Sequence, residues 1–320
     1  MTTHKPVLSL VIPIYNEADG LVDFHASVLG VLKSLSPKIS YEIIYCDDGS
    51  SDESVKVLSA IAAKDETVSV ILFSRNFGKE SALSAGISQA TGEAILTLDG
   101  DGQHPVELIP EFLAAWRDGA RVVIGVRKSS KESLLKRVES KLFYSFFNSL
   151  STQKLVPQST DFRLIDQSVQ AEFLKLDESN RITRGLIDWL GFERAYIGYQ
   201  QKERVGGQPG YSQRKLIQLA MNSIVSLSPR PLYLLGYLGV ILTVLALVVG
   251  ITVIIEQLLL GDPLAWKFTG TAMLGILLLF FVGIILISQG ILAIYISHIH
   301  TESKRRPLYI IDRSRSTRIK

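Results

Sequence analysis

The 320-residue chain is 47% hydrophobic and 20% charged, with a formal net charge of +3. This length allows one large domain, or a medium-sized domain with a further segment. The small positive charge comes largely from the C-terminal end, so we expect no nucleic acid partner. The single cysteine, Cys46, excludes an internal disulfide and is typical of a reducing compartment.

Short apolar runs alternate with helical patterns over the first part of the chain. The runs cover residues 7–15, 41–46, 68–73, 94–98 and 121–126, and the helical patterns cover 20–35, 54–63, 79–89 and 106–116. Continuous apolar runs are typical of strands that are buried on both faces. The alternation therefore predicts an α/β fold whose mostly parallel sheet is covered by helices on both sides.

A polar cluster follows each of the first four predicted strands: "NEAD", "DDGSSD", "SRNFGKE" and "DGDGQHP". The carboxyl ends of parallel strands meet at one edge of the sheet, which we call the rim, and ligands of such sheets bind there. The clusters therefore predict one ligand site at the rim.

Asp99 and Asp101 lie one glycine apart in the fourth cluster. Two carboxylates on a tight turn suit a hard divalent cation with open positions for phosphate oxygens, so we expect Mg²⁺ or Mn²⁺. A calcium loop would need glycine and glutamate where His104 and Pro110 stand, and the dinucleotide fingerprint would need its third glycine at Pro105. A polar turn or helix cap is the remaining alternative.

The second cluster adds two more aspartates at a strand end. Asp47 or Asp48 could accept hydrogen bonds from a base or ribose, while Ser51 or Asp52 would cap the next helix. Together with Pro13, Tyr15 and Glu17 after the first strand, these residues favour a nucleotide pocket.

The pattern changes after residue 126. Residues 133–150 and 212–230 each form an amphipathic helical pattern with basic residues beside apolar ones. Each predicts either a solvated helix that packs on the core or a helix that lies in a membrane interface.

Residues 231–255 and 268–297 contain no charged residue. Each run exceeds the roughly 20 residues that a membrane-spanning helix needs, and neither has the polar stripe of a soluble helix. The connector at 256–267 is short, so the two spans would form a hairpin.

The tail after Ser303 has seven basic residues and one acidic residue. Because Lys and Arg are enriched on the cytoplasmic side of a membrane, we expect both the tail and the N-terminal domain to be cytoplasmic. We expect no signal peptide before the first predicted strand.

Four stretches together resemble the family 2 glycosyltransferases, which have the GT-A fold: "VIPIYNEADG", "DDGSSDES", "SRNFGKESALSAGISQATGEAILTLDGDGQHP" and "STDFRLID". Within that family the chain is similar to the polyprenyl-phosphate glycosyltransferases, the group of dolichol-phosphate mannose synthase and bactoprenol glucosyltransferases. The resemblance runs from about residue 7 to the tail and includes the two-span hairpin.

The resemblance implies roles for the matching residues on the donor side. The nucleoside of a nucleotide sugar would be held by Pro13, Tyr15, Glu17 and Asp48, and its phosphates would be contacted by Arg204. The metal motif would be Asp99, Asp101 and Gln103, with Asp99 nearer the donor. After Arg204 the subgroup usually has Ser-Lys-Tyr, whereas this chain has Pro209, Gly210 and Tyr211, so Arg214 or Lys215 is an alternative basic contact.

On the acceptor side, the resemblance implies a lipid phosphate held by Arg127 and Arg137, with Arg163 as a further candidate. Arginine forks suit a phosphate group. Asp161 matches an acceptor-side carboxylate and completes the expected catalytic set with Asp99 and Asp101. It would position the acceptor or accept a remaining proton, or it would have only a structural role in a turn.

The implied reaction is inverting transfer of a hexose to polyprenyl phosphate, for which UDP-glucose and undecaprenyl phosphate are the preferred substrates. Transfer from GDP-mannose is one alternative, and a non-catalytic membrane-anchored subunit that binds a nucleotide sugar is another. A processive polysaccharide synthase is not favoured, because each tryptophan lacks a preceding arginine and more spans would be needed. A homo-oligomer is left open.

The expected organisation has four parts. Residues 1–210 form a GT-A domain, 211–230 a juxtamembrane amphipathic helix, 231–299 the two spans, and 300–320 a basic cytoplasmic tail. The expected location is the inner (plasma) membrane, as a multi-pass protein with the catalytic domain and both termini in the cytoplasm.

Overall fold

The computed structural model describes residues 6–35, 39–128, 159–178, 181–200 and 270–319, and the single positions 237, 241, 244, 245 and 248. The described residues belong to two compact units. The first, which we call the sheet unit, contains residues 6–128, 159–200 and 305–319 with the gaps given above, and the second contains the long apolar helix α10, Gly270–Ser303.

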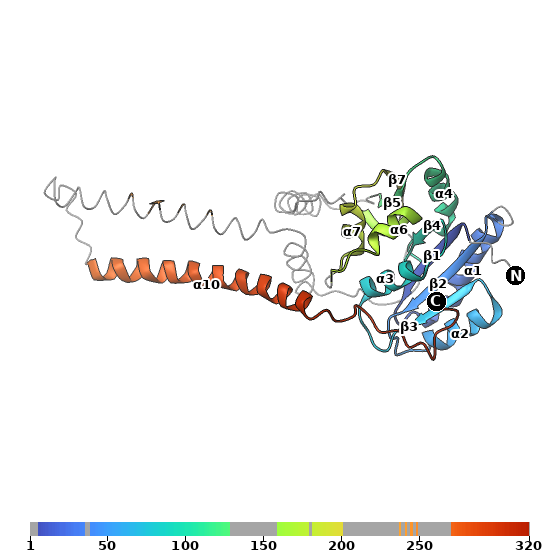
Figure 1. Ribbon diagram of the computed structural model, residues 1–320, viewed down its shortest axis with the longest axis horizontal. Coiled ribbons are helices and arrows are strands. Elements are labelled where there is room, and N and C mark those ends of the chain that lie inside the picture. Colours follow the sequence, from blue (N-terminus) through green and yellow to red (C-terminus); the bar gives the residue numbers. More distant parts are fainter. Residues whose placement is uncertain are drawn as a thin grey trace. The chain divides into compact units, whose positions relative to one another are not determined.

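The sheet unit is built on a seven-stranded mixed sheet with the order β3-β2-β1-β4-β6-β5-β7 (Figure 1). The strands are β1 (Leu8–Ile14), β2 (Tyr41–Asp47), β3 (Val68–Leu72), β4 (Ala94–Thr97), β5 (Val122–Arg127), β6 (Ser159–Asp166) and β7 (Arg194–Tyr199). The five predicted strands are confirmed, and β6 and β7 are additional. β1 pairs in parallel with β2 and β4, and β3 pairs in parallel with β2.

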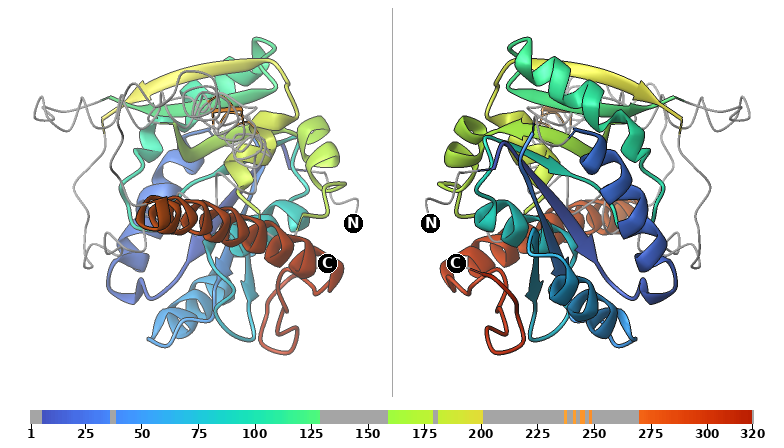
Figure 2. Two further views of the ribbon diagram at one scale, coloured as in Figure 1. Left: turned by 90° about the vertical axis from the view of Figure 1, so that its left-hand side faces the viewer. Right: turned by 90° about the vertical axis from the view of Figure 1, so that its right-hand side faces the viewer.

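Helices cover both faces of the sheet, as predicted. They are α1 (Ala18–Leu35), α2 (Ser54–Lys64), α3 (Lys79–Gln89), the 3₁₀ turn η1 (Val106–Leu108), α4 (Ile109–Arg117), α6 (Gln167–Phe173) and α7 (Thr183–Trp189). One hydrophobic cluster joins the sheet to α1, α2, η1 and α4, and a second joins the opposite face to α3, α6 and α7. Figure 2 shows these two groups of helices on opposite sides of the strands.

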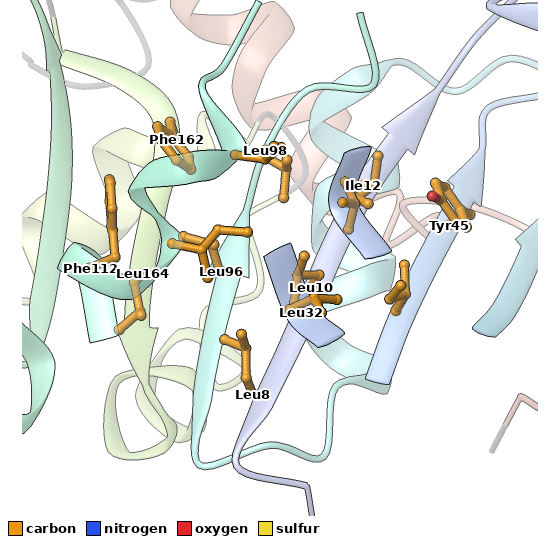
Figure 3. Packing of buried hydrophobic residues seen from close by; sticks show 14 of the residues in the cluster. Leu8, Leu10, Ile12, Leu32, Tyr45, Leu96, Leu98, Phe112, Phe162 and Leu164 are labelled. Carbon is orange, nitrogen blue, oxygen red and sulfur yellow. The ribbon is translucent and has the colours of Figure 1, made fainter. Parts of the chain in front are cut away.

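The core lies where β1 and its neighbours meet α1 and α4. Leu8, Leu10 and Ile12 of β1 are fully buried, and Figure 3 shows them beside Leu32 of α1. The ring of Phe112 on α4 packs at 4.4 Å from the ring of Phe162 on β6. Burial of apolar surface on both faces is the main stabilising contribution here.

β6 runs antiparallel to both β4 and β5. Its first residues, rather than its last, therefore lie at the rim. β5 and β7 run parallel to each other, so Arg127 and Tyr199 at their ends also lie at the rim. The rim thus collects side chains from the start of β6, from the ends of β5 and β7, and from the loops after β1 to β4.

The C-terminal segment, residues 305–319, is bound to the outer edge of β3. The Val70 and Thr317 backbones exchange two hydrogen bonds, and the Ser74 N–H donates to the Ile310 carbonyl. The Tyr309 ring stacks on Phe73, with ring centroids 5.1 Å apart. The basic cytoplasmic tail at 300–320 stays a prediction; of its described residues, 300–303 belong to α10, and 305–319 belong to the sheet unit (Figure 1, dark red).

The predicted second span, residues 268–297, falls almost entirely within α10. Within the described residues one helical stretch, Phe280–Ser303, is long and apolar enough to cross a membrane, and none of it is buried. The predicted first span at 231–255 lies outside the described residues, except for five positions that are helical and exposed. The predicted amphipathic helices at 133–150 and 212–230 also lie outside the described residues.

Candidate active site at the rim of the sheet

The loops after β1 and β2 are joined by side-chain hydrogen bonds. The Asn16 N–H donates to Ser50 Oγ at 2.9 Å, and the Ser51 N–H donates to Asn16 Oδ1 at 2.8 Å. The Ala18 N–H at the start of α1 donates to Asp52 Oδ2. Asp52 therefore caps α1 and not only its own helix, and the first two polar clusters form one surface, as predicted.

Asp48 joins the second cluster to the third. Its carboxylate accepts hydrogen bonds from the backbone N–H groups of Phe77, at 2.7 Å, and Gly78, at 2.9 Å. Asp48 is only 3% exposed. Burial raises the pKa of the Asp48 carboxyl, and the two hydrogen bonds oppose this effect. Asp48 thus fixes the loop that leads into α3. This structural role is additional to the predicted contact of Asp48 with a nucleoside.

Two glycines allow the rim loops to approach closely. Gly49 has a φ of +71°, and a Cβ there would lie 2.5 Å from the Arg75 carbonyl carbon. A Cβ on Gly100 would overlap the Ile14 side chain. A larger residue at position 49 would separate the loop after β2 from the loop after β3. A larger residue at position 100 would separate the turn after β4 from the end of β1.

The centre of the rim is an ammonium held between two carboxylates. Lys79 Nζ lies 2.6 Å from Asp99 Oδ1 and 2.8 Å from Asp161 Oδ2. Enclosure alone would lower the pKa of Lys79, but Asp161 and Asp99 raise it above its usual value. Burial would raise the pKa of Asp161, but Lys79 together with Arg184 and Arg163 lowers it below its usual value. Lys79 and Asp161 are therefore both charged near neutral pH.

The turn after β4 presents Asp99 and Asp101 at the rim. The Asp99 N–H donates to His104 Nδ1 at 3.0 Å, and the Gln103 N–H donates to Asp101 Oδ1 at 3.1 Å. His104 is buried and stacks on Phe162 with ring centroids 5.1 Å apart. Burial lowers the pKa of His104, so its neutral ring accepts at Nδ1 and orients the Asp99 backbone.

No group of three or more His, Cys, Asp or Glu side chains in the described part of the chain could hold a metal ion. The predicted ligands are two carboxylates and one amide, Asp99, Asp101 and Gln103, in a partly exposed turn. Such a set fits an open Mg²⁺ or Mn²⁺ site, because these cations use few protein carboxylates and complete their coordination with water and phosphate oxygens.

The remaining predicted donor-side residues occupy different parts of the rim. Tyr15 is 48% exposed beyond the end of β1, whereas Pro13 and Glu17 are partly exposed. Arg204 lies outside the described residues. The rim thus brings together Pro13, Tyr15, Glu17 and Asp48, whose contacts with a nucleoside stay a prediction.

The predicted acceptor-side arginines have different environments. Arg127 is exposed at the rim end of β5, and Arg137 lies outside the described residues. Arg163 is 1% exposed, with Nη1 2.8 Å from Asp188 Oδ1 and Nε donating to the Thr160 carbonyl. Because its guanidinium is committed to these buried partners, we do not retain Arg163 as a phosphate ligand.

Sequence reasoning missed Lys79 and Arg184. Lys79 was part of the quoted "SRNFGKE" cluster, and its position at the first turn of α3 was the available signal. Arg184, near the start of α7, contributes to the lowered pKa of Asp161. Its proximity to Asp161 depends on the β6–α7 packing, for which the sequence gives no signal.

Comparison with known proteins shows the family of this chain. Residues 9–173 match the family model described as glycosyl transferase family 2. A bactoprenol glucosyl transferase of Shigella phage SfV is 36% identical over 305 residues, which are 95% of this chain and 97% of that protein. An uncharacterised glycosyltransferase of Synechocystis is 37% identical over 305 residues, covering 95% and 94% of the two chains.

A solved glucosyl-3-phosphoglycerate synthase of Mycobacterium tuberculosis is 18% identical, with a TM-score of 0.46 over 69% of this chain and 77% of that chain. This likeness is too weak to carry an argument about ligands. The family match covers more than half of the chain, and the relatives cover nearly all of it. The chain therefore belongs to glycosyl transferase family 2, and its mixed sheet is a GT-A domain.

Proposed function

We propose that this glycosyltransferase moves a hexose from a nucleotide sugar to polyprenyl phosphate, with UDP-glucose and undecaprenyl phosphate as its substrates. The observation that carries the proposal is the near-full-length similarity to a bactoprenol glucosyl transferase, which includes the apolar C-terminal region. A rim with carboxylates next to an ammonium supports the same chemistry.

On the donor side, Asp99 and Asp101 with Gln103 would hold Mg²⁺ or Mn²⁺. When bound, the cation would neutralise charge that develops on the leaving nucleoside diphosphate. The chain's own residues fix the position of this turn. His104 accepts from the Asp99 N–H, and Gly100 allows the turn to lie against the end of β1. Asp48 holds the loop before α3, where the nucleoside would be bound.

On the acceptor side, a phosphate oxygen would attack the anomeric carbon and the nucleoside diphosphate would leave with inversion. A phosphate monoester with a second pKa of about 6 is already largely ionised at neutral pH, so no strong base is required. The lowered pKa of Asp161 makes this carboxylate a weak base. Asp161 therefore acts chiefly by positioning, and Arg127 supplies positive charge at the end of β5.

The proposed location is the membrane, with the sheet unit in the cytoplasm. Two features of the sheet unit support it. β7 ends at the rim with Tyr199, and the C-terminal segment enters at the rim end of β3, where Ile310 bonds Ser74. Both segments are thus described as far as the rim ends of edge strands, and the proposal places a lipid phosphate at this rim. A multi-pass arrangement is part of this proposal.

The test is transfer of labelled hexose from a panel of UDP and GDP sugars to undecaprenyl phosphate by the purified full chain. Product is measured as label in an organic-extractable lipid, with Mg²⁺, Mn²⁺ or EDTA. We expect one donor to be used, metal-dependent transfer, and loss of transfer in Asp101→Ala. Asp118→Ala, an exposed carboxylate at the end of α4, is the matched control and should be as active as the wild type.

Transfer from GDP-mannose alone would support the mannose alternative. Nucleotide-sugar binding without any lipid product would exclude the lipid acceptor and favour a binding subunit. Transfer that persists in EDTA would exclude a required metal ion, and with it the role of Asp99, Asp101 and Gln103 as metal ligands.

A further inference from the structure

We propose that Lys79 binds the acceptor phosphate and is the cation that lets this group enter a rim lined with carboxylates. This inference rests on the proposed function and specifies its acceptor site. It was not implied by the resemblance, which pointed to arginines.

The position of Lys79 links the two sides of the predicted reaction. Its ammonium contacts Asp99, which belongs to the donor-side turn, and Asp161, which belongs to the acceptor side. The two carboxylates come from different strands, since Asp99 follows β4 and Asp161 lies on β6. The ammonium therefore lies where the sugar donor and the lipid phosphate must approach each other.

Lys79 is also accessible, unlike a lysine in a closed structural ion pair. Its side chain is 41% exposed, compared with 2% for Arg163 in the buried pair with Asp188. An ammonium has three N–H donors; Lys79 donates one to Asp161 Oδ2 and forms an ion pair with Asp99 Oδ1. A phosphate oxygen can therefore bind without breaking both ion pairs.

Charge balance requires a cation at this place. A lipid phosphate with about two negative charges would otherwise approach the carboxylates of Asp99 and Asp161 directly, and like charges repel strongly where water is partly excluded. Arg163 does not meet this need because Asp188 holds it. A divalent cation on Asp99 would compete with the ammonium for this carboxylate and leave Lys79 to Asp161 and the phosphate.

Binding is measured first, without donor sugar and with EDTA, so that neither nucleotide nor metal contributes. The probe is farnesyl phosphate, titrated into the detergent-solubilised full chain by calorimetry. We expect Lys79→Met to weaken binding at least about tenfold, as for loss of a hydrogen bond to a charged group, and Lys79→Arg to retain most of the affinity. Lys175→Met, which removes an exposed lysine paired with Glu172, should leave affinity unchanged.

Kinetics then separate this role from simple neutralisation of Asp161. In Lys79→Met we expect a higher KM for undecaprenyl phosphate, with a KM for the donor sugar close to that of the wild type. The double variant Lys79→Met with Asp161→Asn should remain as defective as Lys79→Met. If Asp161→Asn restores affinity, Lys79 only neutralises Asp161 and the proposal is wrong.

The outcomes also separate this inference from the proposed function. A wild type without any lipid product contradicts the proposed function itself. A wild type that makes lipid product, together with a folded Lys79→Met that binds farnesyl phosphate equally well, contradicts only the role of Lys79. Folding is checked by the melting temperature, and the Lys79→Arg variant retains the charge if the methionine variant is unstable.

Discussion

Arg163 and Asp188 form a buried ion pair between β6 and α7. Both Nη atoms of Arg163 donate to the Asp188 carboxylate, at 2.8 and 3.3 Å, and a third hydrogen bond goes to the Arg184 carbonyl. Arg194 is 4.0 Å from the same carboxylate and is the weaker partner. The pair therefore fixes α7 against the sheet beneath Asp161.

We predict that Arg163→Met lowers the free energy of unfolding by about 3 kcal/mol, because Asp188 keeps a buried charge without its main partner. The measurement is denaturant unfolding of the detergent-solubilised protein. The double variant Arg163→Met with Asp188→Leu should recover most of the loss, since an apolar pair can replace a buried ion pair.

The acceptor KM distinguishes this structural role from phosphate binding. A folded Arg163→Met/Asp188→Leu protein should keep the wild-type KM for undecaprenyl phosphate. A large increase in that KM, with normal stability, would return Arg163 to the acceptor site and contradict the role that its burial indicates.

Which residues belong to the site could be predicted better than which side chains those residues contact. Asp99, Asp101 and Asp161 were identified from motifs, and the structure brings Asp99 and Asp161 together through Lys79. Whether an arginine near a strand end points to solvent or into the core depends on the strand's register and on the helix beside it. Neither can be determined from "STDFRLID", so Arg163 was given an acceptor role.

At the scale of elements, the strands that are apolar along their whole length were predictable. β1 to β5 are buried on both faces and give continuous apolar runs. β6 carries Ser159, Thr160 and Asp161 because its first half lines the rim, and it carries Arg163 as the buried partner of Asp188. β7 alternates exposed and buried residues at the edge of the sheet, so its apolar signal is weak. The two missed strands are thus those shaped by function or by the edge.

The C-terminal segment, predicted from its composition only as a basic cytoplasmic tail, covers the edge of the sheet. Arg318 Nη1 donates to the carbonyls of Ala62, Asp65 and Val68, and the Leu72 N–H donates to Ser316 Oγ. These contacts are to backbone groups, so basic composition did not reveal them. An uncovered edge strand would offer its N–H and C=O groups to other chains.

We predict that a chain truncated after Arg306 exchanges selected amide hydrogens of β3 much faster. The Val70, Leu72 and Ser74 N–H groups donate to the C-terminal segment and should lose protection. The Phe73 N–H donates to the Asp47 carbonyl of β2 and should stay protected. The measurement is hydrogen exchange at single-residue resolution.

Lys304→Ala, before the bound segment, is the matched control and should exchange as the wild type does. Equal protection of Val70 and Phe73 in the truncated chain would mean that the C-terminal segment does not pair with β3 in solution. Aggregation of the truncated chain would agree with exposure of the edge and would be measured by light scattering.

At the scale of the whole molecule, β7 is the last described strand before the apolar part of the chain, and the segment after that part pairs with β3. These strands are the two edges of the seven-stranded sheet. At about 4.8 Å between neighbouring strands, the edges lie about 30 Å apart. Residues 213–304 are thus joined to the sheet unit at both of their ends along the chain, so that loss of one junction leaves the other.

We predict that the apolar part serves acceptor delivery and not the chemical step. Replacing residues 213–304 with a Gly/Ser linker of about 40 residues, whose average reach covers the distance between the edges, keeps both attachments and removes α10. This variant should bind UDP-glucose with a Kd near that of the wild type and should glucosylate farnesyl phosphate in solution. On undecaprenyl phosphate in lipid vesicles it should be at least about 100-fold slower, because the effective concentration from membrane anchoring is lost.

Equal rates on vesicles would show that the sheet unit finds its lipid substrate unaided. Loss of transfer to farnesyl phosphate as well, in a folded protein, would instead give residues 213–304 a part in the chemical step.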